Sequence, residues 1–183
     1  AAGTVGSTPA TQGQGKYYID AGATVDLFQG SAVKSSAGYI VTAQAAITNT
    51  CIGVFNGIFY NAATTLKPTW ANWYNQPITP ANSEDVTCFV IDNPTQLFVV
   101  SLDTAAAQAI YGMTMGLTVT AAGSETSGQS SSTLTYATRH VTNNQWRLVR
   151  TAEDPENNQN ATFRSVVVAH NLNQYFTGAV TWA

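Results

Sequence analysis

The side chains that could carry acid–base or metal chemistry are few in this chain, and they are scattered along it. His140 and His170 are its two histidines. Neither belongs to an H-x-H or H-E-x-x-H motif or to a cysteine–histidine spacing, which are the patterns that bring metal ligands together. The sequence therefore predicts no metal site, and each histidine is interpreted as an ordinary surface or strand-end residue.

Nucleophile and carboxylate patterns also fall short of a known catalytic arrangement. The segment Gly128-Gln129-Ser130-Ser131-Ser132 begins like the G-x-S-x-G turn of hydrolases, but it lacks the second glycine and a following helical pattern. Glu84 and Asp85 are adjacent, so on entering a strand their side chains point to opposite faces and cannot flank one substrate. We therefore expect a protein that is not an enzyme, with no catalytic residues and no cofactor.

The two cysteines, Cys51 and Cys88, both lie within apolar, strand-like runs. Cysteine packs readily as a small hydrophobic residue, and two cysteines are too few for a disulfide framework. We expect two buried free thiols.

Charge is unusually sparse. Charged residues make up 9% of the 183 residues and the formal net charge is −3, whereas a soluble domain usually has about a quarter charged residues. Seven basic residues give no electrostatic surface for nucleic acid or for an anionic membrane. A neutral polar surface repels its neighbours weakly, which favours a protein that is packed against others.

An aromatic cluster is the most distinctive local feature. Trp70, Trp73 and Tyr74 lie between Pro68 and Pro77. Such residues can belong to the core, form the centre of a protein interface, or stack on a sugar while neighbouring amides donate hydrogen bonds. All three interpretations stay open; we predict that Trp70 points inward and that Trp73 and Tyr74 at least partly face a partner.

The sequence predicts that the chain folds into short strands, which hold the aromatic cluster and the cysteines in place. Runs rich in β-branched and aromatic residues alternate with Gly, Asn, Pro and Ser, which is typical of an all-β fold. The expected fold is a single antiparallel β-barrel or sandwich. One short helix is predicted from Thr104 to Tyr111, with Asp103 as its N-cap and Gly112 as its end. The strand-like runs cover residues 17–19, 25–28, 39–41, 51–60, 86–91, 96–100, 117–119, 132–136, 146–150 and 164–168.

The first fifteen residues differ from the rest of the chain. They are small, polar and rich in glycine, and Val5 is almost their only apolar residue. Such a segment buries too little apolar surface to offset the entropy of ordering. We predict a flexible arm over residues 1–15, with Val5 as a contact to a partner, followed by one β-domain over residues 16–183. No apolar run approaches the ~18–20 residues of a membrane span, and the arm lacks the pattern of a signal peptide.

The order of these motifs resembles a family of small virion proteins of tailed bacteriophages, the decoration or cement proteins of the head. The resemblance covers roughly residues 17–176. It rests on the run I52-G-V-F-N-G-I-F-Y60, the aromatic segment ending W73-Y-N-Q-P77, the pair of runs D85-V-T-C-F-V-I-D-N-P-T-Q-L-F-V99, the loop at Gly128, and the runs W146-R-L-V-R150 and R164-S-V-V-V168.

This resemblance implies a β-barrel-like subunit that binds the major capsid protein on the outside of an icosahedral shell. It implies self-association as a dimer or trimer, synthesis in the cytoplasm of a bacterial host, and a final location on the capsid surface of the virion. Neither nucleic acid nor a membrane is an expected partner. The alternative is a carbohydrate-binding or adhesin module of a tail fibre or a secreted protein.

Overall fold

The computed structural model describes residues 14–43, 50–105, 107–118, 123–141, 143–158 and 160–175. Within these residues the chain is built almost wholly from antiparallel strands, as predicted. A six-stranded sheet contains, in hydrogen-bonded order, β1 (Gly15–Ile19), β8 (Val86–Ile91), β5 (Gly53–Asn61), β3 (Ala32–Ser36) and β4 (Tyr39–Thr42), with β6 (Pro68–Ala71) also paired to β5. A five-stranded sheet contains β13 (Leu134–His140), β10 (Thr114–Leu117), β14 (Trp146–Thr151), β15 (Ser165–His170) and β9 (Leu97–Ser101).

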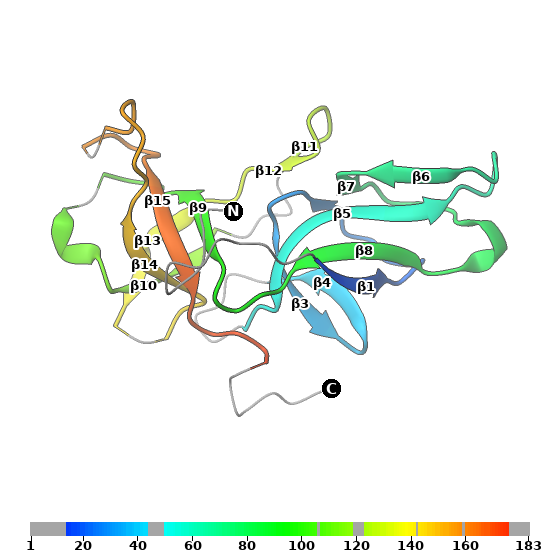
Figure 1. Ribbon diagram of the computed structural model, residues 1–183, viewed down its shortest axis with the longest axis horizontal. Helices are drawn as coiled ribbons and strands as arrows, with labels where there is room; N and C mark the ends of the chain where they lie inside the picture. The colour runs from blue at the N-terminus through cyan, green and yellow to red at the C-terminus, as the bar shows by residue number, and fades with distance from the viewer. Residues whose placement is uncertain are drawn as a thin grey trace.

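Two short two-stranded sheets complete the architecture. They are β2 (Leu27–Phe28) with β7 (Trp73–Tyr74), and β11 (Gly123–Ser124) with β12 (Gln129–Ser130). Figure 1 shows the six-stranded sheet on the right, the five-stranded sheet on the left, and the β11–β12 pair at the top between them. The chain completes the first sheet before it starts the second, so the two sheets come from consecutive halves of the sequence.

The strands form because their apolar residues alternate with polar or partly exposed ones. In β8, Val86, Cys88 and Val90 are fully buried, while the residues between them are partly exposed. This period of two is what a strand with one core-facing side requires. It places one face of the six-stranded sheet in a core that includes Ile19, Val33, Ile40, Phe55, Ile58 and Tyr74.

A second core lies on the five-stranded sheet and reaches the first one. It contains Phe98, Trp146, Leu148, Val166 and Val168, and it also takes Ala32 and Cys51 from the first half of the chain. Cys51 and Cys88 are both free and buried, which confirms the prediction for the two thiols.

The six-stranded sheet curls without closing into a barrel. Its two ends, β1 and β4, come near each other, but the ladders of the described strands pair β1 with β8 and β4 with β3. Of the two predicted architectures, packed sheets therefore describe the molecule better than a closed barrel.

The turn at Asp92-Asn93-Pro94 connects the two sheets. The Asn93 side chain accepts hydrogen bonds from the Thr95 backbone and hydroxyl at 3.0 and 2.8 Å, and Gln96 N donates to Asn93 O at 3.0 Å. The runs on either side of this turn, β8 and β9, belong to different sheets.

The helix predicted from Thr104 to Tyr111 is shorter than expected. Among the described residues of this segment, helical structure is limited to the three-residue 3-10 turn Gln108–Ile110, which follows an extended Ala107. Asp103 does not cap a helix, because its carboxylate accepts the backbone N–H of Tyr136 at 2.9 Å. Tertiary hydrogen bonding has overridden a weak helical preference here. In the described part of the chain no helix is long and apolar enough to cross a membrane.

The segment after β15 returns to the first sheet and ties the two halves together. Cys51 N donates to Leu172 O, and Gln174 N donates to Cys51 O, both at 3.0 Å. The Gln174 amide also accepts from Ser35 N at 2.7 Å and donates to Ser35 O at 3.0 Å. We call residues 171–175 the return segment.

Candidate functional site

The outer face of the six-stranded sheet carries a group of aromatic side chains. Phe59 on β5 lies opposite both Trp70 on β6 and Thr87 on β8, and Tyr18 on β1 also lies opposite Thr87. Directly opposed residues point to the same side of a sheet. Phe89, two residues beyond Thr87, shares that side. We call Tyr18, Phe59, Trp70 and Phe89 the aromatic platform.

Trp70 forms the centre of the aromatic platform. Its ring centroid lies 5.0 Å from that of Phe59 and 5.1 Å from that of Phe89, and the ring is nearly parallel to Phe89 with an interplanar angle of 19°. Trp70 nevertheless remains 67% exposed. It presents a large apolar surface that the described protein does not cover.

Gly57 makes this arrangement possible. It lies opposite Phe89, at an irregularity in the β5–β8 register. With no side chain at this position, the indole of Trp70 can extend across β5 toward Phe89. The backbone is also specific to glycine: φ is +146°, and a Cβ atom would lie 2.7 Å from Ala71 O.

The structure reverses the predicted orientations of two cluster residues. Trp70, predicted to point inward, is exposed, and Tyr74, predicted to face a partner, is 0% exposed. Tyr74 lies opposite Leu27 in the β2–β7 ladder, inside the first core, and its hydroxyl donates to Ala23 O at 3.3 Å. A tyrosine buried in this way is not available to a partner, so Tyr74 is withdrawn as an interface residue.

Trp73 has an intermediate environment. Its ring stacks on Phe28 with a centroid distance of 5.5 Å and an interplanar angle of 5°, and the residue is partly exposed. Its partial exposure leaves it available for the partner contact that was predicted for it, which stays a prediction. Val5, the fourth predicted interface residue, lies outside the described residues.

Two of the three platform residues that sequence reasoning missed, Phe59 and Phe89, left a signal in the sequence. Phe59 and Phe89 are out of phase with the buried neighbours Ile58, Cys88 and Val90. In a strand, a large apolar residue that is out of phase with the core points to the other face. That pattern could have identified both residues before the fold was known.

A small hollow beside Trp70 is bordered by amide side chains. It has a volume of about 300 Å³ and is lined by Gln14, Asn56, Gly57, Trp70, Ala71, Asn72 and Phe89. The Asn72 amide donates to Ser127 O at 2.7 Å, which fixes its orientation. The hollow combines an aromatic wall with neutral hydrogen-bonding groups.

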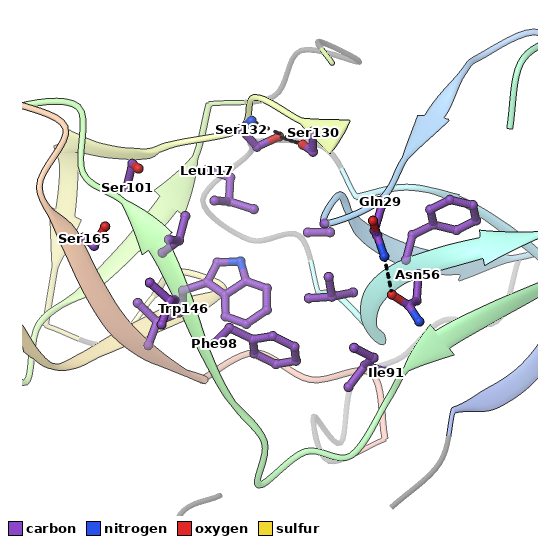
Figure 2. A pocket seen from close by; sticks show the side chains of 17 residues that line it. Gln29, Asn56, Ile91, Phe98, Ser101, Leu117, Ser130, Ser132, Trp146 and Ser165 are labelled. Atoms are coloured by element: carbon purple, nitrogen blue, oxygen red, sulfur yellow. Dashed lines mark hydrogen bonds between the residues drawn. The ribbon is translucent and has the colours of Figure 1, made fainter. Parts of the chain in front are cut away.

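A second hollow lies where the two sheets meet. It has a volume of about 400 Å³ and takes its lining from both halves of the chain. Figure 2 shows Trp146 and Phe98 of the five-stranded sheet on one side of it, and Gln29 and Asn56 of the first half on the other. We call it the seam cavity.

Burial favours the neutral forms of the two thiols and of His170. Burial raises the pKa of the Cys51 and Cys88 thiols to about 12 and lowers the pKa of His170 to about 4. Cys51 Sγ lies 3.4 Å from His170 Nδ1, but a thiol with a raised pKa is a poor nucleophile. His170, predicted to be an ordinary strand-end residue, ends β15 and packs against Trp146 and Phe98.

Metal-binding geometry is not found in the residues that the structure describes, where no group of three or more His, Cys, Asp or Glu side chains could hold an ion. His140 is an exposed residue at the end of β13.

Ser130 and Ser132 line the seam cavity, and Ser130 Oγ donates to Ser132 Oγ at 2.9 Å. A serine nucleophile is usually activated by a histidine. Among the described residues, the hydrogen bonds of these two hydroxyls involve only serines.

Comparison with known proteins adds no relationship. No protein-family model, no curated protein and no solved structure matches this chain.

Proposed function

We propose that this protein is a non-enzymatic structural component of a bacteriophage virion, which decorates and stabilises the capsid by binding the major capsid protein. The proposal draws on the resemblance in the order of motifs and on one structural observation. That observation is the aromatic platform, a stacked and exposed aromatic surface on the outside of a rigid sheet. The residues that form the contact are Trp70, Phe59, Phe89 and Tyr18, with Trp73 at the adjoining edge.

The platform has the composition of the centre of a protein interface. Trp and Tyr are enriched in such centres, where a few aromatic residues supply much of the binding energy. Three of the four side chains are already held against one another, so little side-chain entropy remains to be lost on binding. Lys16, placed opposite Phe89, adds a positive charge to the neighbouring part of this face.

The low charge of the whole chain fits a role within a crowded lattice. Each copy needs only modest affinity, because a protein that binds the assembled shell stabilises it by mass action over many sites. Self-association as a dimer or trimer belongs to the same proposal, as does a contribution from Val5.

A second candidate function is carbohydrate binding, and the hollow beside Trp70 favours it. An exposed indole can stack on the apolar face of a sugar ring, while Asn56 and Asn72 border the same hollow with amide groups. This would make the chain an adhesin module, and a glycan would replace the capsid protein on the platform.

Two binding measurements separate these functions. The purified protein is expected to co-sediment saturably with shells assembled from the capsid protein of the same phage and to raise their disruption temperature. A glycan array should then give no saturable signal. Saturable binding of one glycan class without binding to shells would overturn the capsid proposal in favour of the adhesin.

A further inference from the structure

The seam cavity has the position and the size of a small-molecule site. Its volume of about 400 Å³ lies within the range of about 300–1,000 Å³ that is usual for ligand pockets, and such pockets often form between structural units. Because the two sheets come from consecutive halves of the chain, the cavity exists only when both are in place. None of the four residues of the aromatic platform lines it, although Asn56 borders both the seam cavity and the hollow beside Trp70.

The walls of the seam cavity are largely apolar. Phe98 and Trp146 pack edge to face, with centroids 5.5 Å apart, and both are at least nine-tenths buried. Val54 and Ile91 contribute apolar surface from the six-stranded sheet, and Leu117 does so from β10. Water in such a space makes few hydrogen bonds to the walls, and a ligand with an apolar body gains free energy by displacing it.

Neutral polar side chains also line the seam cavity. Gln29 Nε2 donates to Asn56 Oδ1 at 2.9 Å, and this bond fixes the two amides relative to each other. It leaves the Gln29 carbonyl oxygen as an acceptor. Ser132 Oγ accepts from Ser130 Oγ at 2.9 Å, so its own proton can still be donated.

Trp146 adds a donor on the aromatic side. Its side chain is buried, and within the described part of the chain the indole nitrogen has no hydrogen-bond partner. An unpaired buried N–H is costly. Because this nitrogen is itself covered by protein, a ligand oxygen reaches it only after the side chains around it shift.

Charge decides the class of ligand. The lining of the cavity contains no Asp, Glu, Lys, Arg or His among the described residues. A carboxylate, phosphate or ammonium group placed there would lose its hydration without a counter-charge. We propose that the seam cavity binds a small neutral molecule with an aromatic or aliphatic body and one or two alcohol, amide or arylamine groups. The site does not depend on the proposed role at the capsid.

Fluorescence titration with N-phenyl-1-naphthylamine, a neutral aromatic amine, tests this site. The full chain should bind the probe saturably with one site per chain and with an increase in fluorescence. Ser132→Phe, which adds bulk to the lining, should weaken binding at least tenfold. Ser131→Phe is the matched control, because it adds the same bulk at a neighbouring exposed residue outside the lining, and it should bind as the wild type does.

Two further variants keep the result decisive. Val54→Phe fills the cavity from the opposite sheet, and it replaces Ser132→Phe if circular dichroism shows that the latter does not fold. Trp70→Ala should leave probe binding unchanged, because Trp70 is not part of the cavity. Absence of saturable binding, equal binding by the filled variants, or loss of binding in Trp70→Ala would overturn the proposal.

Discussion

Trp70 and Tyr74 lie four residues apart, yet the first is 67% exposed and the second is 0% exposed. The difference arises because each belongs to its own ladder: Trp70 pairs with Phe59 on β5, and Tyr74 pairs with Leu27 on β2. An aromatic residue in a strand contributes much more to the stability of the fold when its face of the strand is covered. The two residues therefore should have different roles.

Their alanine variants should separate stability from surface function. Tyr74→Ala removes a fully buried aromatic side chain and should lower the free energy of unfolding by about 3–5 kcal/mol. Trp70→Ala removes only the stacking of the indole on two phenylalanines, so it should lower the free energy of unfolding by about 1 kcal/mol. Urea unfolding followed by circular dichroism measures both values, and equal losses would contradict these assignments.

The lowered pKa of His170 predicts that the folded protein loses stability as the pH falls. The pKa of His170 is lowered to about 4 by burial, whereas an unfolded histidine titrates near pH 6.5. Below pH 6.5 the unfolded chain takes up a proton that the folded chain excludes, so stability is lost as pH falls from about 6.5 to 4. The loss amounts to about 1.4 kcal/mol per pH unit at most, or about 3 kcal/mol over the interval.

Unfolding free energies measured between pH 7 and pH 4 test this expectation. His170→Gln should flatten the dependence by that amount, whatever its effect on stability at pH 7. His140→Gln, a change at an exposed histidine, should keep the wild-type slope. An unchanged slope in His170→Gln would show that other groups cause the acid sensitivity.

Among the elements, β5 lies at the centre of the aromatic platform, because its register irregularity at Gly57 lets β6 and β8 share one aromatic surface. Gly57→Ala should cost about 1–3 kcal/mol, since the new Cβ meets Ala71 O and the backbone conformation is strained. Gly38→Ala is the control: φ there is also positive, at +87°, but no atom lies within 4 Å of the added Cβ. If the two variants unfold at the same urea concentration, the contact with Ala71 is not the cause of the constraint at Gly57.

Strand-forming patterns made the all-β class predictable, because residues such as those of β8 alternate with period two. The same patterns do not say which strands pair, so Asp92-Asn93-Pro94 could not be recognised as a link between sheets. Asp103 misled the helix prediction because its true partner, Tyr136 N, is distant in sequence. The aromatic cluster was correctly singled out, but the face of each residue depends on pairings with Phe59 and Leu27 that appear only in the fold.

On the scale of the whole molecule, the return segment joins the two halves of the chain through Cys51 and Ser35. Gln174→Ala removes two hydrogen bonds to the Ser35 backbone and should lower the free energy of unfolding by about 1–3 kcal/mol. Gln129→Ala, at an exposed glutamine, should have little effect. Calorimetry measures both variants, and a Gln174→Ala protein as stable as the wild type would show that the halves are held together by the shared core instead.

The proposed binding of the aromatic platform to the capsid can be tested by comparing two variants at equally exposed residues. Trp70 and Val141 are both 67% exposed, but only Trp70 belongs to the platform. In sedimentation with assembled shells, Trp70→Ala should bind at least about 30-fold more weakly than the wild type, the equivalent of a loss of about 2 kcal/mol at an interface hot spot. Val141→Ala should bind as the wild type does. Equal affinity of both variants for the shells would contradict the claim.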